Sequence, residues 1–316
     1  MTKSRMNIGS ADVLIIGGGP AGLSALLWCK ELGMSAVLIE KNAEFGGQLL
    51  SIHNPITNYL GRTAANGREM LGHFISQIDI LDKSSVLNGS VVEFDVAKIT
   101  AALSTGESVS ARAAIIATGI RRRRLNVPGE TEFEGRGILE SGARDKRSVM
   151  GRRVAIVGGG DAALENALIL AEFAEKVYVI HRRSEFSARP EFVGRAVKIP
   201  KIEFVFNSTV NRFLGNEQMS AVSLSTPSGE LLVDVDAALI RIGVQPNSEI
   251  FAGQLDLDAA GYIKVDHLGA TNAPNVFAAG DVANPVSPTI STAVGTAVTA
   301  AQTAFSYLIS SPNSCS

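Results

Sequence analysis

Cysteine is scarce in this 316-residue chain, which has only Cys29 and Cys315. Two cysteines are too few for a disulfide framework or a cysteine-based zinc site. The sequence also lacks a run of about 18 uncharged apolar residues, the length that crosses a bilayer, because its most apolar stretch, residues 289–309, contains Ser, Thr and Gln. A net charge of −2 gives no overall basic field for nucleic acid. The first 11 residues contain no apolar leader, so we expect a soluble cytoplasmic protein that binds neither membrane nor nucleic acid.

Glycine is abundant in contrast, with 31 residues, and several glycines belong to a repeated unit. Each copy has a β-branched run, a glycine-rich turn, an apolar helical stretch and a second short strand. The first copy occupies residues 13–16, 17–22, 23–32 and 37–40, and the second occupies residues 154–157, 158–163, 164–173 and 177–183. Such units favour parallel sheets made from βαβ crossovers. The length fits about two domains, and we predict an α/β fold with two Rossmann-like dinucleotide-binding domains.

Both turns carry the dinucleotide-binding fingerprint, Gly-x-Gly-x-x-Gly in the first copy and Gly-x-Gly-x-x-Ala in the second. The first glycine permits the tight turn, the second lets the backbone approach a pyrophosphate, and the small third residue allows close packing of helix on strand. The N–H groups at the start of the helix then face the anion. The positions are Gly17, Gly19, Gly22, Gly158, Gly160 and Ala163. A single motif also occurs in turns without a ligand, but two copies in this context predict nucleotide binding.

The residues that end the second strand of each copy predict different ligands. Glu40 lies 23 positions after the first glycine of its turn, where an acid accepts hydrogen bonds from both ribose hydroxyls. We therefore expect the first copy to hold an unphosphorylated ribose, as in FAD or NAD. The second copy has His181, Arg182 and Arg183 here, which offer donors and positive charge to a 2′-phosphate. This favours NADPH over NADH, and the alternative is a solvated basic strand end.

Further segments complete a family resemblance. Residues 113–119 form a buried strand that ends in a turn, residues 273–283 form a strand and a loop with Asp281, and Gly46-Gly47-Gln48 follows the first unit. Together with the first fingerprint they resemble the FAD domain of pyridine nucleotide-disulfide oxidoreductases, and their order is similar to that of low-molecular-weight thioredoxin reductases. The resemblance implies a homodimer of three-layer ββα domains. An NAD(P)H-binding domain, residues 121–244, would be inserted in a discontinuous FAD-binding domain, residues 1–120 and 245–316.

The resemblance implies two sets of cofactor-binding residues, and neither a catalytic side chain nor a metal ligand. Gln48 and Asn58 would approach the flavin, and Asp281 would hold the ribityl chain or the pyrophosphate side. The last helix, opened by Thr289 and Ile290, would direct its N-terminal dipole at the flavin. The FAD set comprises Gly17, Gly19, Pro20, Ala21, Gly22, Glu40, Lys41, Gly47, Gln48, Asn58, Val92, Thr118, Gly119, Gly280, Asp281, Thr289 and Ile290. The NADPH set comprises Gly158, Gly160, Asp161, Ala162, Ala163, His181, Arg182, Arg183 and Arg189.

Two positions depart from the family pattern. Relatives have Arg-Gln-Ala where this chain has Pro288-Thr289-Ile290, so the side-chain part of the flavin contact would differ. Relatives also place an arginine in the slot of Ser187, whereas Arg189 follows two residues later. One phosphate contact would therefore be moved or lost, and we expect a smaller preference for NADPH than relatives show.

A thioredoxin reductase needs a redox-active Cys-x-x-Cys-Asp segment in its NADP domain. In that family the first cysteine precedes the second fingerprint by 17 residues, which leads here to Ser141-Gly142-Ala143-Arg144-Asp145. Neither Ser141 nor Arg144 takes part in thiol–disulfide exchange. Cys29 lies in a predicted helix, as a buried structural thiol would, and Cys315 in a Ser-, Pro- and Asn-rich tail that we expect to be disordered. We therefore predict that the chain does not reduce disulfides by the usual route.

The electron acceptor stays open between three hypotheses. The dithiol-free segment and its basic surroundings also resemble thioredoxin-reductase-type ferredoxin/flavodoxin–NADP reductases, and a basic patch would steer an acidic carrier. The basic residues are Arg121–Arg124, Arg144, Lys146, Arg147, Arg152 and Arg153. Alternatively, these side chains solvate the hinge or contact the nucleotide. The other hypotheses are an NADPH oxidase or quinone or small-molecule reductase, and a catalytically silent nucleotide-binding flavoprotein.

Overall fold

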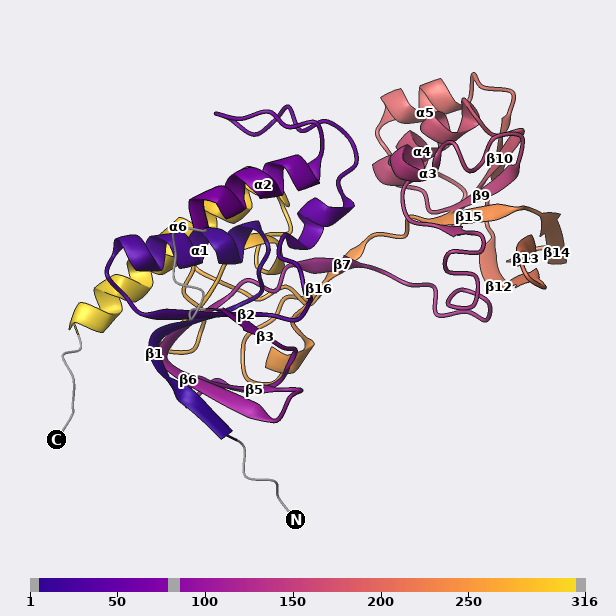
Figure 1. The fold of residues 1–316 in the computed structure, drawn as a ribbon. Helices are drawn as coiled ribbons and strands as arrows, with labels where there is room; N and C mark the ends of the chain where they lie inside the picture. The colour runs from indigo at the N-terminus through magenta and orange to yellow at the C-terminus, as the bar shows by residue number, and fades with distance from the viewer. Residues whose placement is uncertain (1–5, 79–85, 311–316) are drawn as a thin grey trace, which may run out of the picture. The chain divides into compact units, whose positions relative to one another are not determined.

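The structure is a computed structural model that describes residues 6–78 and 86–310 (Figure 1). The chain forms two compact units: unit 1 runs up to Arg121 and continues from Gln245, and unit 2 is Arg122–Val244. The family resemblance of the sequence predicts the two crossings after residues 120 and 244. Strands β7 (Ile120–Arg122) and β16 (Val244–Pro246) carry the crossings and pair as a two-stranded sheet. Within the described ranges, no helix is long and apolar enough to cross a membrane.

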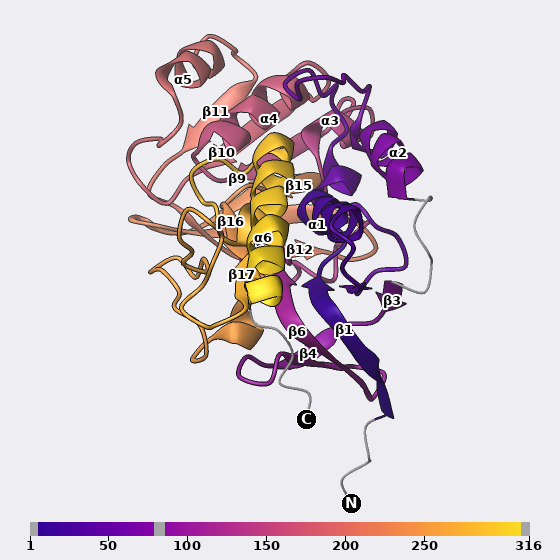
Figure 2. The same ribbon diagram turned by 90° about the vertical axis from the view of Figure 1, so that its left-hand side faces the viewer.

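Unit 1 is built on a mainly parallel sheet of seven strands in the order β3-β2-β1-β6-β5-β4, with β17 paired to β6. Strands β4 and β5 are antiparallel, and β5 pairs antiparallel with the first half of β6. Helices α1 and α6 lie side by side and cover one face of the parallel strands (Figures 1 and 2). The elements are β1 (Met6–Ile16), α1 (Pro20–Glu31), β2 (Ala36–Glu40), η1 (Gly47–Ser51), α2 (Gly67–Ile78), β3 (Val86–Asn88), β4 (Val91–Asp95), β5 (Thr100–Leu103), β6 (Glu107–Ile116), η3 (Glu249–Phe251), β17 (Val276–Ala278), η4 (Gly280–Val282) and α6 (Ile290–Ser310).

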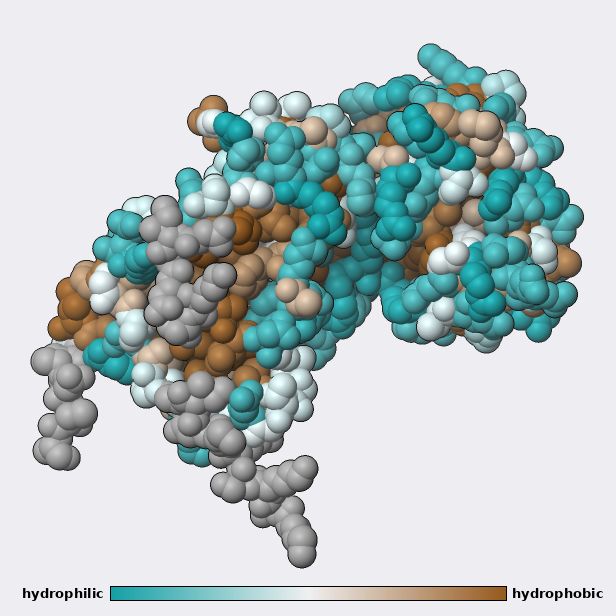
Figure 3. All heavy atoms as spheres, in the orientation of Figure 1, coloured by the Kyte–Doolittle hydropathy of each residue, from teal (hydrophilic) through white to brown (hydrophobic). Residues whose placement is uncertain are grey.

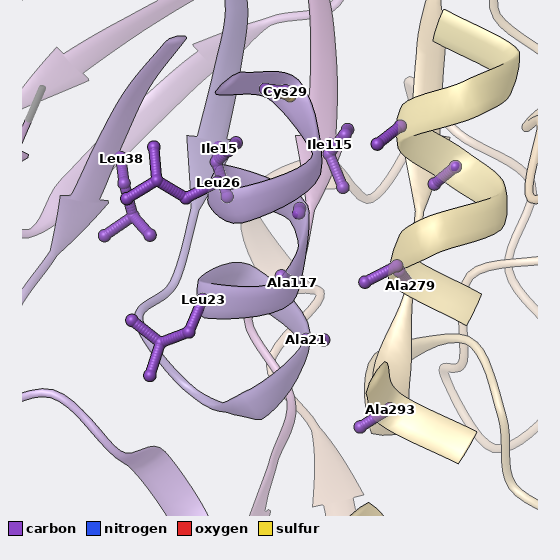
Figure 4. Close-up of a cluster of buried hydrophobic side chains, with 14 of the residues drawn as sticks. Ile15, Ala21, Leu23, Leu26, Cys29, Leu38, Ile115, Ala117, Ala279 and Ala293 are labelled. Atoms are coloured by element: carbon purple, nitrogen blue, oxygen red, sulfur yellow. The ribbon is translucent and has the colours of Figure 1, made fainter. Parts of the chain in front are cut away.

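The helical face of unit 1 holds its main core (Figure 4). Leu23 and Leu26 of α1 pack on Ile15, Leu38 and Ile115 of the sheet. Burying a leucine side chain fully contributes about 1.5–3 kcal/mol. Helix α6 faces this core with small residues, which let the two helices approach closely. These residues are Ala293, Ala297, Ala300, Ala301 and Ala304.

Cys29 is part of the same core and is completely buried. Burial raises the pKa of its thiol to about 12. A thiol that stays protonated is neither a nucleophile nor a partner in disulfide exchange, so Cys29 has a packing role. Cys315 lies outside the described residues.

Unit 2 contains a parallel sheet in the order β11-β10-β9-β15-β8 and a separate antiparallel sheet, β12-β13-β14. Helices α3–α5 lie on one side of the parallel sheet and β12–β14 on the other, which gives three layers (Figure 1). The elements are β8 (Ile138–Leu139), α3 (Gly142–Asp145), β9 (Arg153–Val157), α4 (Asp161–Ala171), β10 (Lys176–Ile180), α5 (Pro190–Ala196), β11 (Ile202–Val205), β12 (Thr209–Gly215), β13 (Met219–Thr226), β14 (Gly229–Asp234) and β15 (Ala237–Ile240). The α/β fold with two Rossmann-like domains is therefore confirmed.

The bounds of several elements differ from the sequence prediction. Strands β1 and β6 begin at Met6 and Glu107, several residues earlier than predicted, because their first residues pair with each other. Both fingerprint helices begin within the turn, at Pro20 and Asp161 rather than three residues later. Proline suits this first helical position because its fixed φ matches the helix and its missing N–H would have no intrahelical partner.

Candidate nucleotide-binding sites

The first glycine-rich turn is shaped by close backbone packing. Gly17 has a φ of 108°, and a Cβ there would lie 2.5 Å from the carbonyl oxygen of Ala117. A Cβ on Gly22 would overlap with the carbonyl oxygen of Gly17. Gly19 differs, because the nearest atom to its Cβ position is Gly47 Cα at 3.9 Å. It precedes α1 without any side-chain cap, so the first N–H groups of the helix remain available to an anion.

Glu40 is held rigidly at the end of β2. Its carboxylate is buried and accepts the N–H of Gly18 at 2.7 Å. The other oxygen accepts the N–H of Asn42 at 2.8 Å and its side-chain amide at 2.9 Å. The acid therefore connects the turn to the strand end, at the position where a ribose would lie.

These groups border a cavity of about 500 Å³ in unit 1, a size typical of ligand sites. The predicted FAD residues that line it are Gly17, Gly19, Pro20, Ala21, Glu40, Lys41, Gly47, Gln48, Asn58, Thr118, Gly119, Asp281, Thr289 and Ile290. An adjoining cavity of about 300 Å³ shares Glu40 and Lys41 and extends to Ser90 and Val91. Segments from both halves of unit 1 thus converge on one elongated site.

Three predicted FAD residues lie outside these linings. Gly22 and Gly280 stand behind the cavity, where a Cβ would meet Gly17 or Ala21. They serve the packing of α1 and not direct contact with a ligand. Val92 is 51% exposed on β4, and its neighbour Val91 lines the adjoining cavity instead. The contact of Val92 with FAD stays a prediction.

Asp281 is the unsatisfied acid of this cavity. It lies in η4 after β17, half-buried, and its carboxylate accepts no hydrogen bond from the residues that the structure describes. Burial raises the pKa of this carboxyl group above its usual range. An unpaired carboxylate that lines a cavity can be satisfied by hydroxyl donors of a ligand.

Helix α6 begins beside the same cavity. Thr289 precedes its first residue, Ile290, and the Thr289 hydroxyl accepts the N–H of Thr292 at 3.1 Å. Thr289 and Ile290 both line the cavity. The positive end of a 21-residue helix therefore lies at the cavity wall.

Other lining residues were missed: several directly adjoin predicted residues, such as Gly18 and Asn42, and others, such as Asn247, come from distant segments. Asn247, just after the second crossing, donates its side-chain amide to Thr118 O at 2.7 Å and accepts the Thr118 hydroxyl at its own carbonyl at 2.7 Å. Gln48 donates to Ile120 O at 2.8 Å. The missed set comprises Gly18, Asn42, Leu49, Ile52, Pro55, Ile56, Ala117, Ile120, Arg121, Asn247, Ala279, Pro288 and Ala293. No local motif marks most of these positions.

The second glycine-rich turn repeats the backbone design in unit 2. Gly158 has a φ of 147°, and a Cβ there would overlap with the carbonyl oxygen of Arg241. Gly160 precedes α4 without a side-chain cap, and the nearest atom to its Cβ position is Ser187 Oγ at 3.9 Å. Ala163 lies within the first turn of the helix and is fully buried.

His181 occupies the strand end that Glu40 occupies in unit 1. The residue is only 7% exposed, and its ring packs on Gly159 with its centroid 5.6 Å from that of Phe186. Burial lowers the pKa of His181, so the ring is neutral near pH 7. Arg182 and Arg183, both exposed, therefore carry the positive charge of this strand end.

The loop after β10 is fastened to the glycine-rich turn. The N–H groups of Ser187 and Ala188 donate to Gly159 O at 2.8 and 3.1 Å. Arg189 donates its N–H and its guanidinium to the two carboxylate oxygens of Asp161, each at 2.7 Å. These contacts hold Arg182 and Arg183 on a closed loop beside the start of α4, with Ala162 in its first turn.

The segment that replaces the dithiol is bound by ion pairs. Ser141 precedes α3, and Asp145 accepts the N–H groups of Glu140 and Ser141 at 2.8 and 3.0 Å. Arg144 forms ion pairs with Glu140 and Asp145. The structure therefore places no thiol in this segment.

Four of the nine cations of the predicted basic patch form ion pairs, Arg144 among them. Arg121 pairs with Glu249 in unit 1. In unit 2, Arg124 pairs with Glu134 at 2.6 Å, and Arg153 pairs with Asp234 and Asp236 at 3.2 and 3.3 Å. Hydrophilic side chains predominate on the face of unit 2 in Figure 3.

Two turns of this geometry, each beside an uncapped helix, define a protein with two dinucleotide-binding domains. A family model described as pyridine nucleotide-disulphide oxidoreductase matches residues 11–304, and the chain belongs to this family. The chain is 33% identical over 274 residues to a thioredoxin reductase of Listeria innocua, covering 86% of this chain and 85% of that protein. It is 34% identical over 279 residues to a thioredoxin reductase of Streptomyces coelicolor, covering 86% of each.

Solved structures agree with this assignment. Lactococcus lactis thioredoxin reductase in its FR conformation matches with a TM-score of 0.79 at 30% identity, covering 95% of this chain and all of that one. A bacillithiol disulfide reductase of Bacillus cereus, at 21% identity and a TM-score of 0.75, covers 94% of this chain and 99% of that one and supports the fold alone. Members of the thioredoxin-reductase-like group use FAD and NADPH.

Proposed function

We propose that this oxidoreductase passes electrons from NADPH through FAD to an external acceptor without a dithiol relay. The observation that carries the proposal is the segment 140–145, where Ser141 and an ion-paired Arg144 stand at the positions at which thioredoxin reductases have cysteines. The only described cysteine, Cys29, is buried in the core of unit 1. FAD, when bound, would supply the two-electron chemistry that takes electrons from NADPH and returns them to an acceptor.

The cavity of unit 1 fits the FAD of this proposal. Glycine leaves room for a pyrophosphate at Gly19, Glu40 is fixed beside the ribose position, and Asp281 lacks a donor. In unit 2, the uncapped start of α4 with Arg182 and Arg183 would hold NADPH. The residues of the chain bind, orient and shield, and no side chain is proposed as an acid, base or nucleophile.

We further propose a small-molecule acceptor, such as a quinone or oxygen, that reaches the flavin directly. The ion pairs of Arg121, Arg124, Arg144 and Arg153 offset four of the nine charges of the basic patch that an acidic carrier would require. A ferredoxin or flavodoxin is the second candidate, supported by Arg147 and Arg152, which are exposed and form no ion pair within the described ranges. The homodimer of the sequence analysis remains a proposal.

The test is steady-state NADPH oxidation by the FAD-loaded protein with oxygen, a quinone, ferredoxin, flavodoxin or thioredoxin as acceptor. We expect turnover with the quinone and none with thioredoxin above free-flavin chemistry. A rate of ferredoxin or flavodoxin reduction that falls steeply with salt would favour the second candidate. The reason is that electrostatic attraction of the carrier to the basic patch is screened beyond about 10 Å at 0.1 M salt.

A matched variant sharpens the test of the missing relay. Ser141→Cys with Arg144→Cys restores the thiols at the two positions and also removes the ion pairs of Arg144. Arg144→Ala alone is the control for those ion pairs. Thioredoxin turnover in a variant that lacks both Cys29 and Cys315, with Ser141 and Arg144 intact, would refute the proposal.

A further inference from the structure

The order of strands in unit 2 marks one crevice beside the second glycine-rich turn. From β9 the chain proceeds to β10 and β11 on one side, whereas β15 and β8 lie on the other side of β9 (Figure 1). Ligands of open α/β sheets bind outside the carboxyl ends of the strands, where the order reverses in this way. The two strands at this point end at Val157 and Ile240. Gly158 and Arg241 follow them directly.

Arg241 is a buried cation without an ion pair among the described residues, although the charge of Asp145 acts on it from farther away. It is 9% exposed, and its guanidinium donates to the carbonyl oxygens of Ile240 and Glu140, each at 2.7 Å. No carboxylate of the described residues lies within ion-pair distance of it. Burial, and then the positive charge of Arg122, lowers the pKa of Arg241 to about 10. The group therefore stays charged at neutral pH, and an unpaired buried charge is costly.

Arg122 provides a second, accessible cation at this place, because it ends β7 and the next residue, Arg123, donates its N–H to Gly243 O at 3.0 Å, two residues after Arg241. Its side chain is exposed and has neither an ion pair nor a hydrogen bond to any residue in the described ranges. Glu140 is the carboxylate that attracts it, but Glu140 is already paired with Arg144. Two neighbouring guanidinium groups repel each other unless an anion lies between them.

We propose that Arg122 and Arg241 bind a phosphate-type oxyanion at the carboxyl edge of the unit 2 sheet. Planar guanidinium groups match phosphate oxygens with paired N–H donors. Arg241 supplies a buried, oriented anchor, and Arg122 supplies the open side through which the ligand enters. The oxyanion has two possible sources. One is the diphosphate of NADPH lying on Gly158, and this assignment rests on the proposed function. The other is the phosphate group of a separate ligand, and this assignment is independent of the proposed function.

The test uses inorganic pyrophosphate as the probe, with the full-length, FAD-loaded protein at constant ionic strength. Calorimetric titration measures its Kd for the wild type, Arg122→Met, Arg241→Met and the control Arg147→Met. Arg147 lies on the same unit and is exposed, so its loss removes one charge without touching the site. We expect each site variant to weaken binding about tenfold or more, the loss typical of a charge-assisted hydrogen bond, and the control to bind as the wild type does.

Arg241→Met also removes the hydrogen bond to Glu140 O and can lower stability. If Arg241→Met does not fold, the Kd of Arg122→Met alone tests the site. The site is overturned if the wild type does not bind pyrophosphate, or if Arg122→Met binds it as the wild type does. Competition between pyrophosphate and NADP⁺ would identify the dinucleotide as the source of the oxyanion, and independent binding would identify a separate ligand. Pyrophosphate binding that depends on Arg122, in a protein that does not oxidise NADPH, would keep this site and refute the proposed function.

Discussion

The two glycine-rich turns have similar backbone arrangements and differ in the side chain that packs on each of them from the end of the second strand. In unit 1 the carboxylate of Glu40 accepts the N–H of Gly18, whereas in unit 2 the neutral ring of His181 packs on Gly159. The anion-binding geometry is thus the same in both units. The strand end carries the hydrogen-bonded acid Glu40 in unit 1 and the uncharged ring of His181 in unit 2. Ligand choice in unit 2 therefore rests on Arg182 and Arg183, which lie beyond the buried ring.

The largest effect is expected from variants that fill the pyrophosphate position of one turn at a time, because these distinguish the ligand of unit 1 from that of unit 2. A Cβ at Gly19 or Gly160 meets no protein atom closer than 3.9 Å, so valine is tolerated by the fold but occupies the space of the ligand. We expect Gly19→Val to raise the Kd for FAD by roughly 100-fold or more, since at least two charge-assisted contacts are lost. Gly160→Val should retain FAD and lose NADPH oxidation.

Flavin absorbance after purification and NADP⁺ titration by calorimetry measure the two effects, with circular dichroism as the check on folding. Gly72→Val is the control on α2, where a Cβ meets nothing within 4 Å and no cavity lining is involved. A Gly19→Val protein that retains full flavin would contradict the assignment of FAD to unit 1.

The contrast between these turns also shows what the sequence can predict. The glycines, Glu40 and the two helices follow from local patterns, and the structure brings them together around one cavity. The neutrality of His181 depends on its burial, which no spacing reveals. The register shift between Val91 and Glu93, beside which Val91 lines the adjoining cavity, also has no signal in the sequence. Asn247 reaches Thr118 across 129 positions of the chain, so it carries no local signal.

The second prediction concerns the charge of the unit 2 strand end. Arg182→Ala with Arg183→Ala should reduce the ratio of kcat/KM for NADPH to that for NADH by about tenfold or more, since each charge-assisted phosphate contact is worth roughly 1.5–3 kcal/mol. The value for NADH itself should change little. Wild-type protein that uses both nucleotides equally would show that these arginines form only a solvated surface.

A smaller effect is expected from the pair that fastens the loop. Arg189→Ala leaves the carboxylate of Asp161 uncompensated at the start of α4, where an anionic ligand would bind, and releases the loop. Because the pair is exposed, we expect the KM for NADPH to rise only about two- to fivefold. Adding Asp161→Asn removes the uncompensated charge and should recover part of the loss. No recovery in the double variant would show that the loop contact alone matters.

The smallest expected effect tests the difference between the two acids of unit 1. Glu40 is satisfied by three N–H donors, but Asp281 has none among the described residues, and burial raises its pKa in the folded protein. The folded state then binds this proton more tightly than the unfolded chain, so the stability of the FAD-free protein falls as pH rises through the raised pKa. Above that range the ionised carboxylate is a constant cost.

Asp281→Asn removes this cost while retaining an acceptor. In FAD-free protein at pH 7, we expect the variant to melt higher than the wild type, by about 2 °C, and the two melting temperatures to converge as the pH falls below 3.8, the ordinary value of this group. In the same variant FAD should bind more weakly, because an amide is a poorer acceptor than a carboxylate for hydroxyl donors. A gain in stability that persists unchanged at acid pH would show that the ionisation of Asp281 is not its source. Unaltered FAD affinity would show that the acid does not face the cofactor.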